Sequence, residues 1–239
     1  MRKLQDRWVF LTILSVVLVA PGIATADPIR VDQLSPVSGD GIGSGCCAFG
    51  DFAQTFTVGV TGILRTVALP LSRPDFFPDD DFSGQLGIQL RPTVAGIPSD
   101  SVLTEMILSK SSLPALSTPG VRFEFTTFFS GLNIPIVEGE QLAIVLSNVG
   151  HAGQNIRWAQ NTTASYTGGA PYQQTRENPG IEGDQGPVTG PWLPDTCCQD
   201  FDFAFFTSVE PAAIVAPTPE PGTMLLLGTG ILWLARRRL

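Results

Sequence analysis

The chain has 239 residues, of which 43% are hydrophobic, and a formal net charge of −8 at pH 7. Six of its 14 basic residues but only two of its 22 acidic residues lie in the two ends, so residues 27–218 hold 8 basic and 20 acidic residues and have a net charge of −12. Nucleic acids bind to basic surfaces, so this acidic balance argues against a nucleic-acid partner and fits a soluble exported protein.

The N-terminal segment has the layout of a secretory signal. Three basic residues within the first seven precede an apolar run over residues 8–19, and Ala24 and Ala26 form a small-x-small site for signal peptidase. The run of about 12 residues is shorter than the roughly 20 that a membrane-spanning helix requires, which is the competing interpretation. We therefore expect residues 1–26 to direct the chain to the secretion machinery and to be removed before Asp27.

The central region reads as a series of short strands. Apolar residues alternate with polar ones, or recur at every second position, within residues 67–71, 86–90, 121–125, 142–146 and 201–205, with weaker strands at 102–108 and 155–160 and a first strand at 52–58. Gly, Pro and Asp dominate residues 74–84 and 168–194, which we expect to be loops. About eight strands with no helical periodicity predict an all-β domain over residues 27–210, an antiparallel two-sheet sandwich or jelly roll.

Several short motifs occur in a fixed succession along this region. They are Ala53-Gln54-Thr55-Phe56-Thr57-Val58, Glu140-Gln141-Leu142-Ala143-Ile144-Val145-Leu146, Arg157-Trp158, Tyr166-Thr167-Gly168-Gly169, Trp192 and Phe201-Asp202-Phe203-Ala204-Phe205. The succession resembles the choice-of-anchor β-sandwich domains of bacterial surface proteins over roughly residues 52–208. The resemblance implies a fold and a location at the cell surface, and the family has no assigned activity to carry over to this chain.

The C-terminal segment contains three distinct parts after a linker of small residues and prolines at 211–218. They are the triplet Pro219-Glu220-Pro221, an apolar stretch over residues 222–235, and the cluster Arg236-Arg237-Arg238. This order at the C-terminus resembles a PEP-CTERM sorting signal, which assigns residues 219–239 to that signal. The resemblance implies that an exosortase, a membrane enzyme, processes the chain.

The physical properties of this tail agree with such a role. Fourteen residues of helix span about 21 Å, which is short for a permanent membrane crossing but enough to hold the chain in the membrane before processing. The three arginines keep their end on the cytoplasmic side. We expect transient anchoring in the inner membrane, followed by delivery to the cell surface or extracellular matrix; the alternative is an ordinary anchor that is never cut.

Few residue clusters suggest chemistry. Asp79, Asp80 and Asp81 are a weak candidate site for a structural calcium ion, although a solvated acidic turn is the favoured interpretation, and we expect no other cofactor. The chain has one histidine, His151, so the usual hydrolase arrangements lack parts, and we expect no catalytic residues. A secreted hydrolase is the third interpretation, behind a surface component and a glycan-binding module.

The leading interpretation is a non-catalytic component of the cell surface or extracellular matrix. The rival is a module that binds glycans such as the producer's exopolysaccharide. Tyr166, Tyr172 and Trp192 lie in expected loops and are the candidate sugar contacts, whereas Trp158 lies in an expected strand, where packing in the core is commoner.

Four cysteines form two adjacent pairs, Cys46-Cys47 and Cys197-Cys198. Exported chains meet an oxidising compartment, so disulfides are expected rather than zinc, for which the ligand spacing is missing. Each pair precedes an expected strand, and the first and last strands of a jelly roll are commonly neighbours. An antiparallel arrangement would nevertheless place the starts of these two strands roughly 20 Å apart.

We predict that the two pairs bond to each other, because adjacent cysteines bonded together would form strained eight-membered rings. Two of the three connectivities join the pairs, and such bridges would stabilise the domain by several kcal/mol, roughly, in the chain-entropy model. Peptide mapping without reduction should recover one linked species that contains all four cysteines. Recovery of two separate vicinal rings would contradict the prediction.

Overall fold

The structure is a computed structural model, and it describes residues 28–37, 44–46, 50–74, 84–116, 125–149, 156–162, 166–175, 190–195 and 201–212. The predicted signal segment, the predicted sorting tail with its membrane helix, and Asp79 to Asp81 lie outside the described residues, as do Cys47, Cys197 and Cys198. The expectations for these segments therefore remain predictions. Pro28–Ala212 form one compact unit.

Strands make up nearly all of the regular structure, which confirms the all-β prediction. The strands are β1 (Arg30–Ser35), β2 (Ser44–Cys46), β3 (Gly50–Thr57), β4 (Gly62–Leu69), β5 (Leu71–Pro74), β6 (Gln85–Val94), β7 (Ile97–Pro98), β8 (Thr104–Ser109), β9 (Ala115–Leu116), β10 (Thr126–Ile136), β11 (Gln141–Val149), β12 (Ile156–Trp158), β13 (Gln160–Asn161), β14 (Pro171–Thr175), β15 (Leu193–Pro194), β16 (Asp202–Phe203) and β17 (Phe205–Pro211). A single turn of 3-10 helix, η1 (Lys110–Ser112), follows β8.

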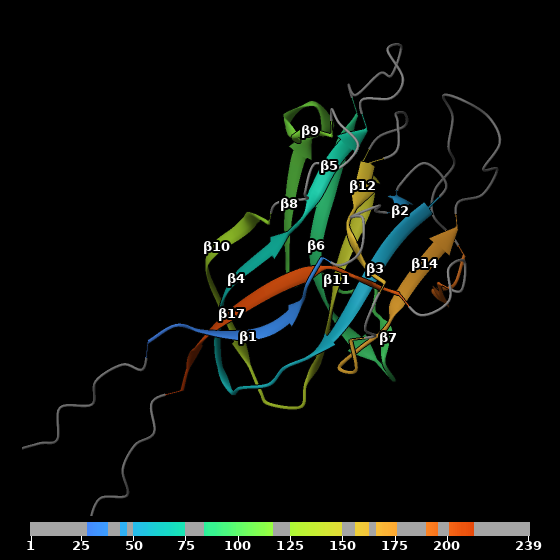
Figure 1. Cartoon of the computed structure of the whole chain (residues 1–239). Helices are drawn as coiled ribbons and strands as arrows, with labels where there is room; N and C mark the ends of the chain where they lie inside the picture. Colours follow the sequence, from blue (N-terminus) through green and yellow to red (C-terminus); the bar gives the residue numbers. More distant parts are fainter. Residues whose placement is uncertain are drawn as a thin grey trace, which may run out of the picture. The chain divides into compact units, whose positions relative to one another are not determined.

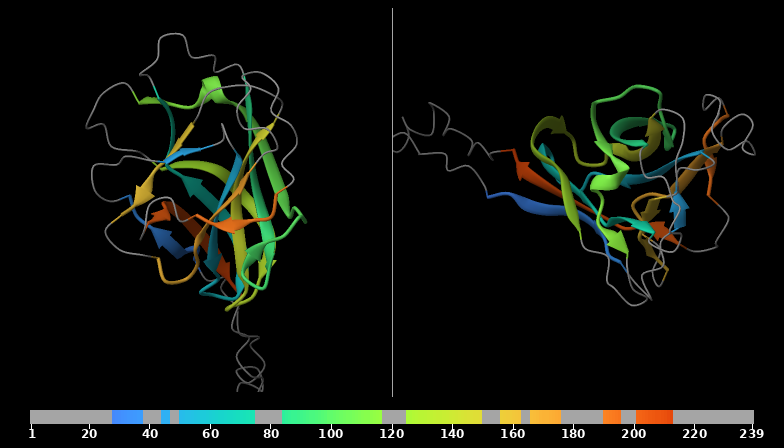
Figure 2. Two further views of the ribbon diagram at one scale, coloured as in Figure 1. Left: turned by 90° about the vertical axis from the view of Figure 1, so that its right-hand side faces the viewer. Right: turned by 90° about the horizontal axis from the view of Figure 1, so that it is seen from above.

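Two large sheets face each other across the core (Figures 1 and 2). The larger has the strand order β15-β14-β3-β11-β6-β7, with β8 also paired to β6, and the smaller has the order β1-β17-β4-β10. Two further ladders, β2-β12-β5-β9 and β13-β16, complete the sandwich. All described pairs are antiparallel except the two-residue pair of β5 and β9.

Three extended segments are each interrupted by one residue, and the strands before and after that residue pair in different ladders. Pro70 separates β4 from β5, Ala159 separates β12 from β13, and Ala204 separates β16 from β17. The amide of Ala159 donates to the carbonyl of Pro70 at 3.1 Å, and the amide of Ala204 donates to the carbonyl of Ala159 at 2.8 Å. These two bonds keep the backbone paired where β12 and β13 enter between the neighbouring strands.

The alternating pattern of the sequence explains the core. In β11, Leu142, Ile144 and Leu146 point into the main cluster of buried residues, which also contains the alternating leucines and isoleucine of β6. The intervening residues of β11, Ala143 and Val145, are also buried, on the opposite face of the sheet. The central strand is therefore covered on both faces, whereas the alternation of its larger apolar residues predicted one buried face.

Aromatic rings fill the space between the sheets. Trp158 is fully buried and stacks on Phe203 with ring centroids 4.4 Å apart, and its indole donates to the carbonyl of Ala204 at 2.7 Å. Phe201 and Phe52 meet Phe203 edge-on at 5.4 and 5.9 Å. The preference for core packing at Trp158 is confirmed.

A buried polar network crosses the core at the same level. The side-chain amide of Gln54 in β3 donates through Nε2 to Asp202 Oδ1 at 3.0 Å and accepts through Oε1 from the backbone amide of Phe203 at 2.8 Å. The second carboxylate oxygen of Asp202 accepts from the amide of Tyr166 at 2.5 Å. Burial raises the pKa of Asp202, although these hydrogen bonds oppose the shift. The network ties the larger sheet to β16 and to the segment that leads into β14.

The first and last strands of the domain lie side by side. β1 pairs with β17, with Arg30 opposite Val209, so the chain enters and leaves the domain at one end (Figure 1). β17 also pairs with β4 on its other side. The expected neighbourhood of strands 52–58 and 201–208 is not a backbone pairing, because β3 belongs to the larger sheet and β17 to the smaller.

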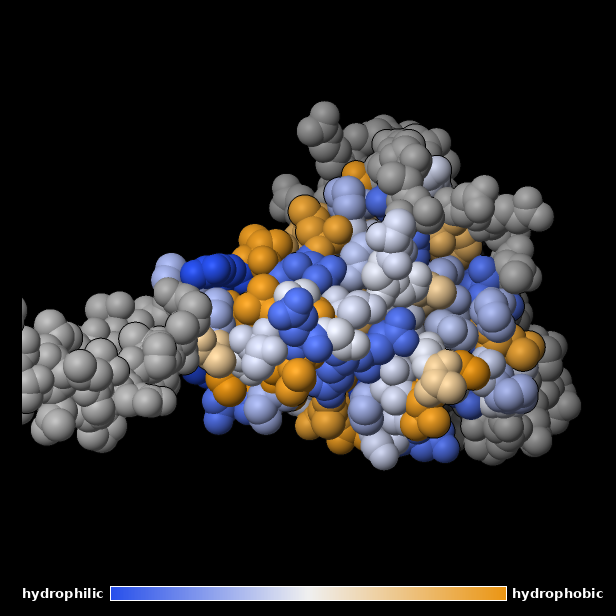
Figure 3. All heavy atoms as spheres, turned by 90° about the horizontal axis from the view of Figure 1, so that it is seen from below, coloured by the Kyte–Doolittle hydropathy of each residue, from blue (hydrophilic) through white to orange (hydrophobic). Residues whose placement is uncertain are grey.

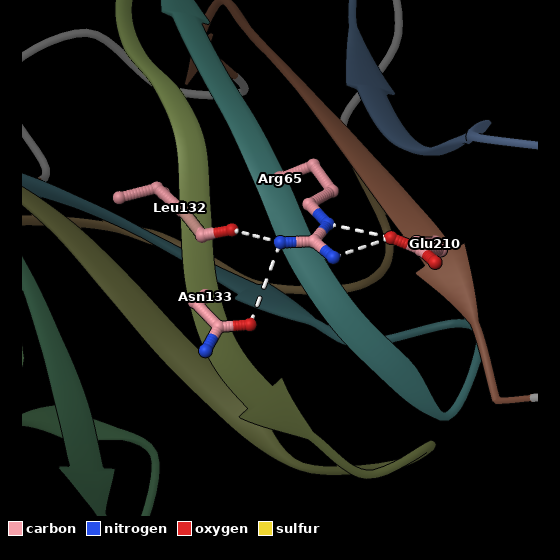
Figure 4. Close-up of polar contacts among 4 residues, drawn as sticks. All are labelled: Arg65, Leu132, Asn133 and Glu210. Atoms are coloured by element: carbon pink, nitrogen blue, oxygen red, sulfur yellow. Dashed lines mark hydrogen bonds and ion pairs between the residues drawn. The ribbon is translucent and has the colours of Figure 1, made fainter.

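Arg65 of β4 connects three strands of the smaller sheet (Figure 4). Its guanidinium donates to Glu210 Oε2 of β17 at 2.7 and 2.5 Å and to the carbonyl of Leu132 of β10 at 2.8 Å. A longer bond of 3.4 Å reaches the side-chain oxygen of Asn133. Glu210 is close to the end of the domain, so the contact fixes the last strand where the chain leaves it.

Two expectations about local structure differ from the structure. Residues 168–194, expected to be a loop, contain β14 and β15, because Pro171 to Thr175 pair along β3 despite their polar composition. A long strand, β10, follows the alternating residues 121–125 instead of coinciding with them, and residues 121–124 lie outside the described part of the chain. The described strands also exceed the expected eight, since β1 was not predicted and several strands are interrupted.

We predict that replacing Arg65 with methionine lowers the free energy of unfolding by about 1 kcal/mol, because the variant keeps the apolar stem but loses the tie between strands. The side chains of Arg65 and Glu210 are 27% and 31% exposed, so solvent screening limits the effect. Thermal unfolding should show a midpoint lowered by about 2–4 °C. Glu210→Gln, which keeps an acceptor oxygen, should lower the midpoint less; an unchanged midpoint in Arg65→Met would contradict the role.

Candidate functional site on the outer face of the larger sheet

Small side chains occupy the outward positions at the centre of the larger sheet. Ala53 and Thr55 of β3, Ala143 of β11 and Gly87 of β6 all point away from the core or lack a side chain, and all are buried. A Cβ at Gly87 would lie 2.6 Å from the hydroxyl of Ser147, so side chains of the neighbouring strands occupy the space above this glycine. Something must cover these positions, because the apolar ones are removed from water.

Part of the cover is aromatic. Trp192 packs against Ala53, Ala143 and Val145, and Tyr172 of β14 packs beside it, half-buried. The small side chains leave room for the indole, of which only 7% is exposed. The indole N–H is buried and has no hydrogen-bond acceptor among the described residues. The aromatic pair is thus a packed cluster on the outer face, with Tyr172 as its more accessible member.

Hydrogen bonds to the backbone and to a side chain of β14 hold the segment that carries Trp192. The amide of Asp195 donates to the carbonyl of Pro171 at 3.1 Å, and the side chain of Gln174 donates to the carbonyl of Gly190 at 2.5 Å. β14 in turn pairs along the edge of β3. The position of the indole therefore depends on the edge pairing of a strand that the sequence did not predict.

A chain of polar side chains lies on the same face. Gln89 donates to Glu105 Oε1 at 2.5 Å and accepts from Arg91 Nε at 2.7 Å. Arg91 also donates to the carbonyl of Ser99 at 3.1 Å. Burial lowers the pKa of the Arg91 guanidinium, and the nearby carboxylates of Asp51, Asp100 and Glu105 oppose this shift. The guanidinium is thus held by hydrogen bonds to two acceptors, Gln89 Oε1 and the carbonyl of Ser99.

The strand register connects the aromatic and polar parts. Tyr172 lies opposite Ala53, Ala53 opposite Val145, Val145 opposite Gln89, and Gln89 opposite Glu105. Residues directly opposite one another project from the same face of a sheet. One row across five strands therefore runs from an aromatic ring, over small apolar side chains, to a hydrogen-bonding amide and carboxylate.

Tyr166 lies apart from this row. Its ring packs against the main core and meets Phe205 edge-on at 5.2 Å, and its hydroxyl donates to Gln33 at 2.5 Å. Burial, with the charges of Asp32 and Asp202 adding to it, raises the pKa of Tyr166 to about 12. The structure thus brings together two of the three candidate glycan contacts, Tyr172 and Trp192, and places Tyr166 in a structural position.

Sequence reasoning missed the polar row of Gln89, Arg91 and Glu105. The alternation of Gln89 and Arg91 with buried Ile88 and Leu90 shows that both point outward, so their direction was readable. The contact of Gln89 with Glu105 could not be predicted from the sequence, because it depends on the pairing of β6 with β8.

The remaining candidate residues are outside the described part of the chain, with one exception. Cys46 ends β2, where it lies opposite Ile156 of β12, and the disulfide connectivity stays a prediction. Among the described residues, no group of three or more potential ligands could hold a metal ion. No described helix is both long and apolar enough to span a bilayer.

Comparison with protein families finds one motif in the chain. Residues 217–238 match the PEP-CTERM protein-sorting motif, which confirms the prediction of such a signal in this segment; the roles of Pro219, Glu220, Pro221 and the three arginines stay predictions. The motif implies an exported protein that an exosortase processes and that is sorted to the cell surface. No curated protein matches the chain. The resemblance of the β domain to choice-of-anchor domains remains a prediction.

Proposed function

We propose that the protein is a non-catalytic component of the cell surface or extracellular matrix, displayed after its sorting tail has been processed. The sorting motif at residues 217–238 is the observation that carries this proposal. Two ionisable groups have clear structural partners: both carboxylate oxygens of the buried Asp202 accept hydrogen bonds, and the partly exposed ion pair of Arg65 and Glu210 joins strands. These hydrogen bonds and this ion pair favour a structural role for the groups over a catalytic one.

The route to the surface passes through the membrane. After signal peptidase removes residues 1–26, the apolar stretch at 222–235 and the three terminal arginines hold the chain in the inner membrane, with the β domain outside. The prolines at 219 and 221 prevent a helix from extending through the triplet, which leaves an extended segment for the exosortase. Cleavage then transfers the domain to the surface or matrix.

We predict that replacing Pro219, Glu220 and Pro221 with alanine leaves export intact but keeps the chain in the inner membrane, because the apolar stretch and the arginines are unchanged. Cell fractionation with detection of the β domain measures the distribution. In the native host, the intact mass of the unaltered protein should lack both ends. A main surface form that retains Arg236 to Arg238, or normal surface delivery of the triple variant, would contradict processing at this motif.

Glycan binding is the second candidate function, and the row on the outer face of the larger sheet favours it. Sugars bind through stacking of their apolar faces on aromatic rings and through hydrogen bonds to planar polar side chains. Tyr172 supplies a half-buried ring, and Arg91 and Glu105 supply charged groups. Exopolysaccharide of the producing cell is the proposed ligand class.

We predict that Tyr172→Ala and Arg91→Ala each weaken co-sedimentation with exopolysaccharide purified from the producing cells by roughly tenfold, as expected for the loss of about 1.5 kcal/mol. Leu34→Ala, which removes a half-exposed apolar side chain from the smaller sheet, is the matched control and should bind normally. Thermal unfolding of each variant separates binding from folding. Equal binding by all three variants, or none by the unaltered protein, would argue against glycan recognition on this face.

A further inference from the structure

The end of the domain where the chain enters and leaves is built from three adjacent turns. In the turn between β3 and β4, Thr61 accepts hydrogen bonds from the amides of Glu138 and Ala212, at 2.9 and 3.0 Å. The turn between β10 and β11 is joined to the end of β3 by bonds between Val58 and residues 139 and 140. The turn between β6 and β7 lies beside the start of β11, because Thr93 donates to the carbonyl of Gln141 at 3.0 Å. We call this surface the chain-end face.

The three most exposed apolar side chains of the described structure lie at this end of the domain. Val94, Val137 and Ile29 are between 60% and 69% exposed, which is more than any other large apolar residue described. Val94 ends β6, Val137 follows the end of β10, and Ile29 precedes β1. Figure 3 shows the molecule from below, with apolar side chains in several groups and polar ones between them. We call these three residues the apolar tips.

The turn that carries Val94 has a fixed shape. Ala95 and Gly96 both have positive φ, 53° and 84°, and Val94 pairs with Ile97 across them. Two such residues in succession form the tight turn that matches the twist of a hairpin. Ile97 is also exposed, at 42%. The hairpin therefore holds two apolar side chains outward on a rigid support.

The sorting motif begins a few residues after the compact unit ends. The unit ends at Ala212, and six residues lie between Ala212 and Pro219. The seven Cα–Cα steps from Ala212 to Pro219 span about 25 Å at most. If the tail is anchored in the membrane from Pro219 onward, the linker keeps Ala212, at the end of the domain, within about 25 Å of the anchor.

From these observations we infer that the chain-end face rests on the outer surface of the lipid bilayer while the tail is anchored, with the apolar tips in the headgroup region. This inference rests on the membrane step of the proposed function. Isolated apolar side chains that project from rigid turns gain favourable free energy when they enter the boundary between headgroups and acyl chains. The tail supplies proximity, so the tips need contribute only modest affinity of their own.

The charges on this face favour a weakly charged bilayer over a second copy of the chain. Glu138 and Glu140 are exposed beside Val137. Two copies placed face to face would bring these carboxylates together, and like charges repel. The ammonium groups of phosphatidylethanolamine would instead pair with them, whereas phosphatidylglycerol would repel them.

The test uses the full chain in vesicles of phosphatidylethanolamine and phosphatidylcholine, with the photoreactive residue benzoylphenylalanine in place of Val94 or Val137. The matched control carries it in place of Ile107, which is 49% exposed in β8 and away from the turns. Irradiation of the floated vesicles should give several-fold more lipid adduct at positions 94 and 137 than at position 107. Adding phosphatidylglycerol should lower labelling at positions 94 and 137, and raised salt should restore it.

Each alternative outcome is distinct. A chain that fails to float with the vesicles overturns the membrane anchoring, and this contact with it. A chain that floats but labels lipid equally at positions 94, 137 and 107 overturns the contact alone. Protein–protein adducts at positions 94 and 137 in place of lipid adducts would identify a second copy as the occupant and overturn the bilayer contact.

Discussion

The buried hydrogen bonds between Gln54 and Asp202 are the constraint on which the sandwich depends. A carboxylate and an amide removed from water are costly unless every strong donor and acceptor is matched, and here the partners come from strands of different ladders. Gln54 can meet Asp202 only when β3 and β16 are in the correct register, and Asp202 can accept from Tyr166 only when the segment before β14 is in place. Apolar packing alone tolerates small shifts; this network does not, and it therefore selects one arrangement of the two sheets.

The same arrangement determines what the outer face of the larger sheet can present. The segment anchored by Asp202 continues into β14, which pairs with β3 and supports the loop that carries Trp192. The aromatic cover of Ala53 and Ala143 is thus linked to a carboxylate on the other side of the sheet. The polar side chains Gln89, Arg91 and Glu105 do not depend on this segment, because they belong to β6 and β8, which pair directly with each other. The two halves of the candidate site accordingly have different structural supports.

The strands that the sequence revealed are those whose apolar residues alternate, such as β11 and β6, since their burial follows from their own composition. β14 was hidden because Pro171, Gln173 and Gln174 show no alternation, and its extended form comes from hydrogen bonds to β3. Tyr166 and Tyr172 are six residues apart and looked equivalent, yet one packs into the core and the other on the outer face. The direction of a side chain after a turn depends on the tertiary partner, which one sequence does not contain. The sorting tail, in contrast, was readable because it is a contiguous motif.

The pairing of β1 with β17 has a consequence for how such a domain could be reused. Because its first and last strands are hydrogen-bonded neighbours, the two ends of the compact unit Pro28–Ala212 lie close together, and the unit can be inserted between two adjacent residues of a host loop. Adjacent termini are the property that makes circular permutation and insertion into surface loops tolerable. The unit is thus suited to transplantation into a loop of an unrelated scaffold, where the host would replace the native tail as its point of attachment and leave both sheets unaltered.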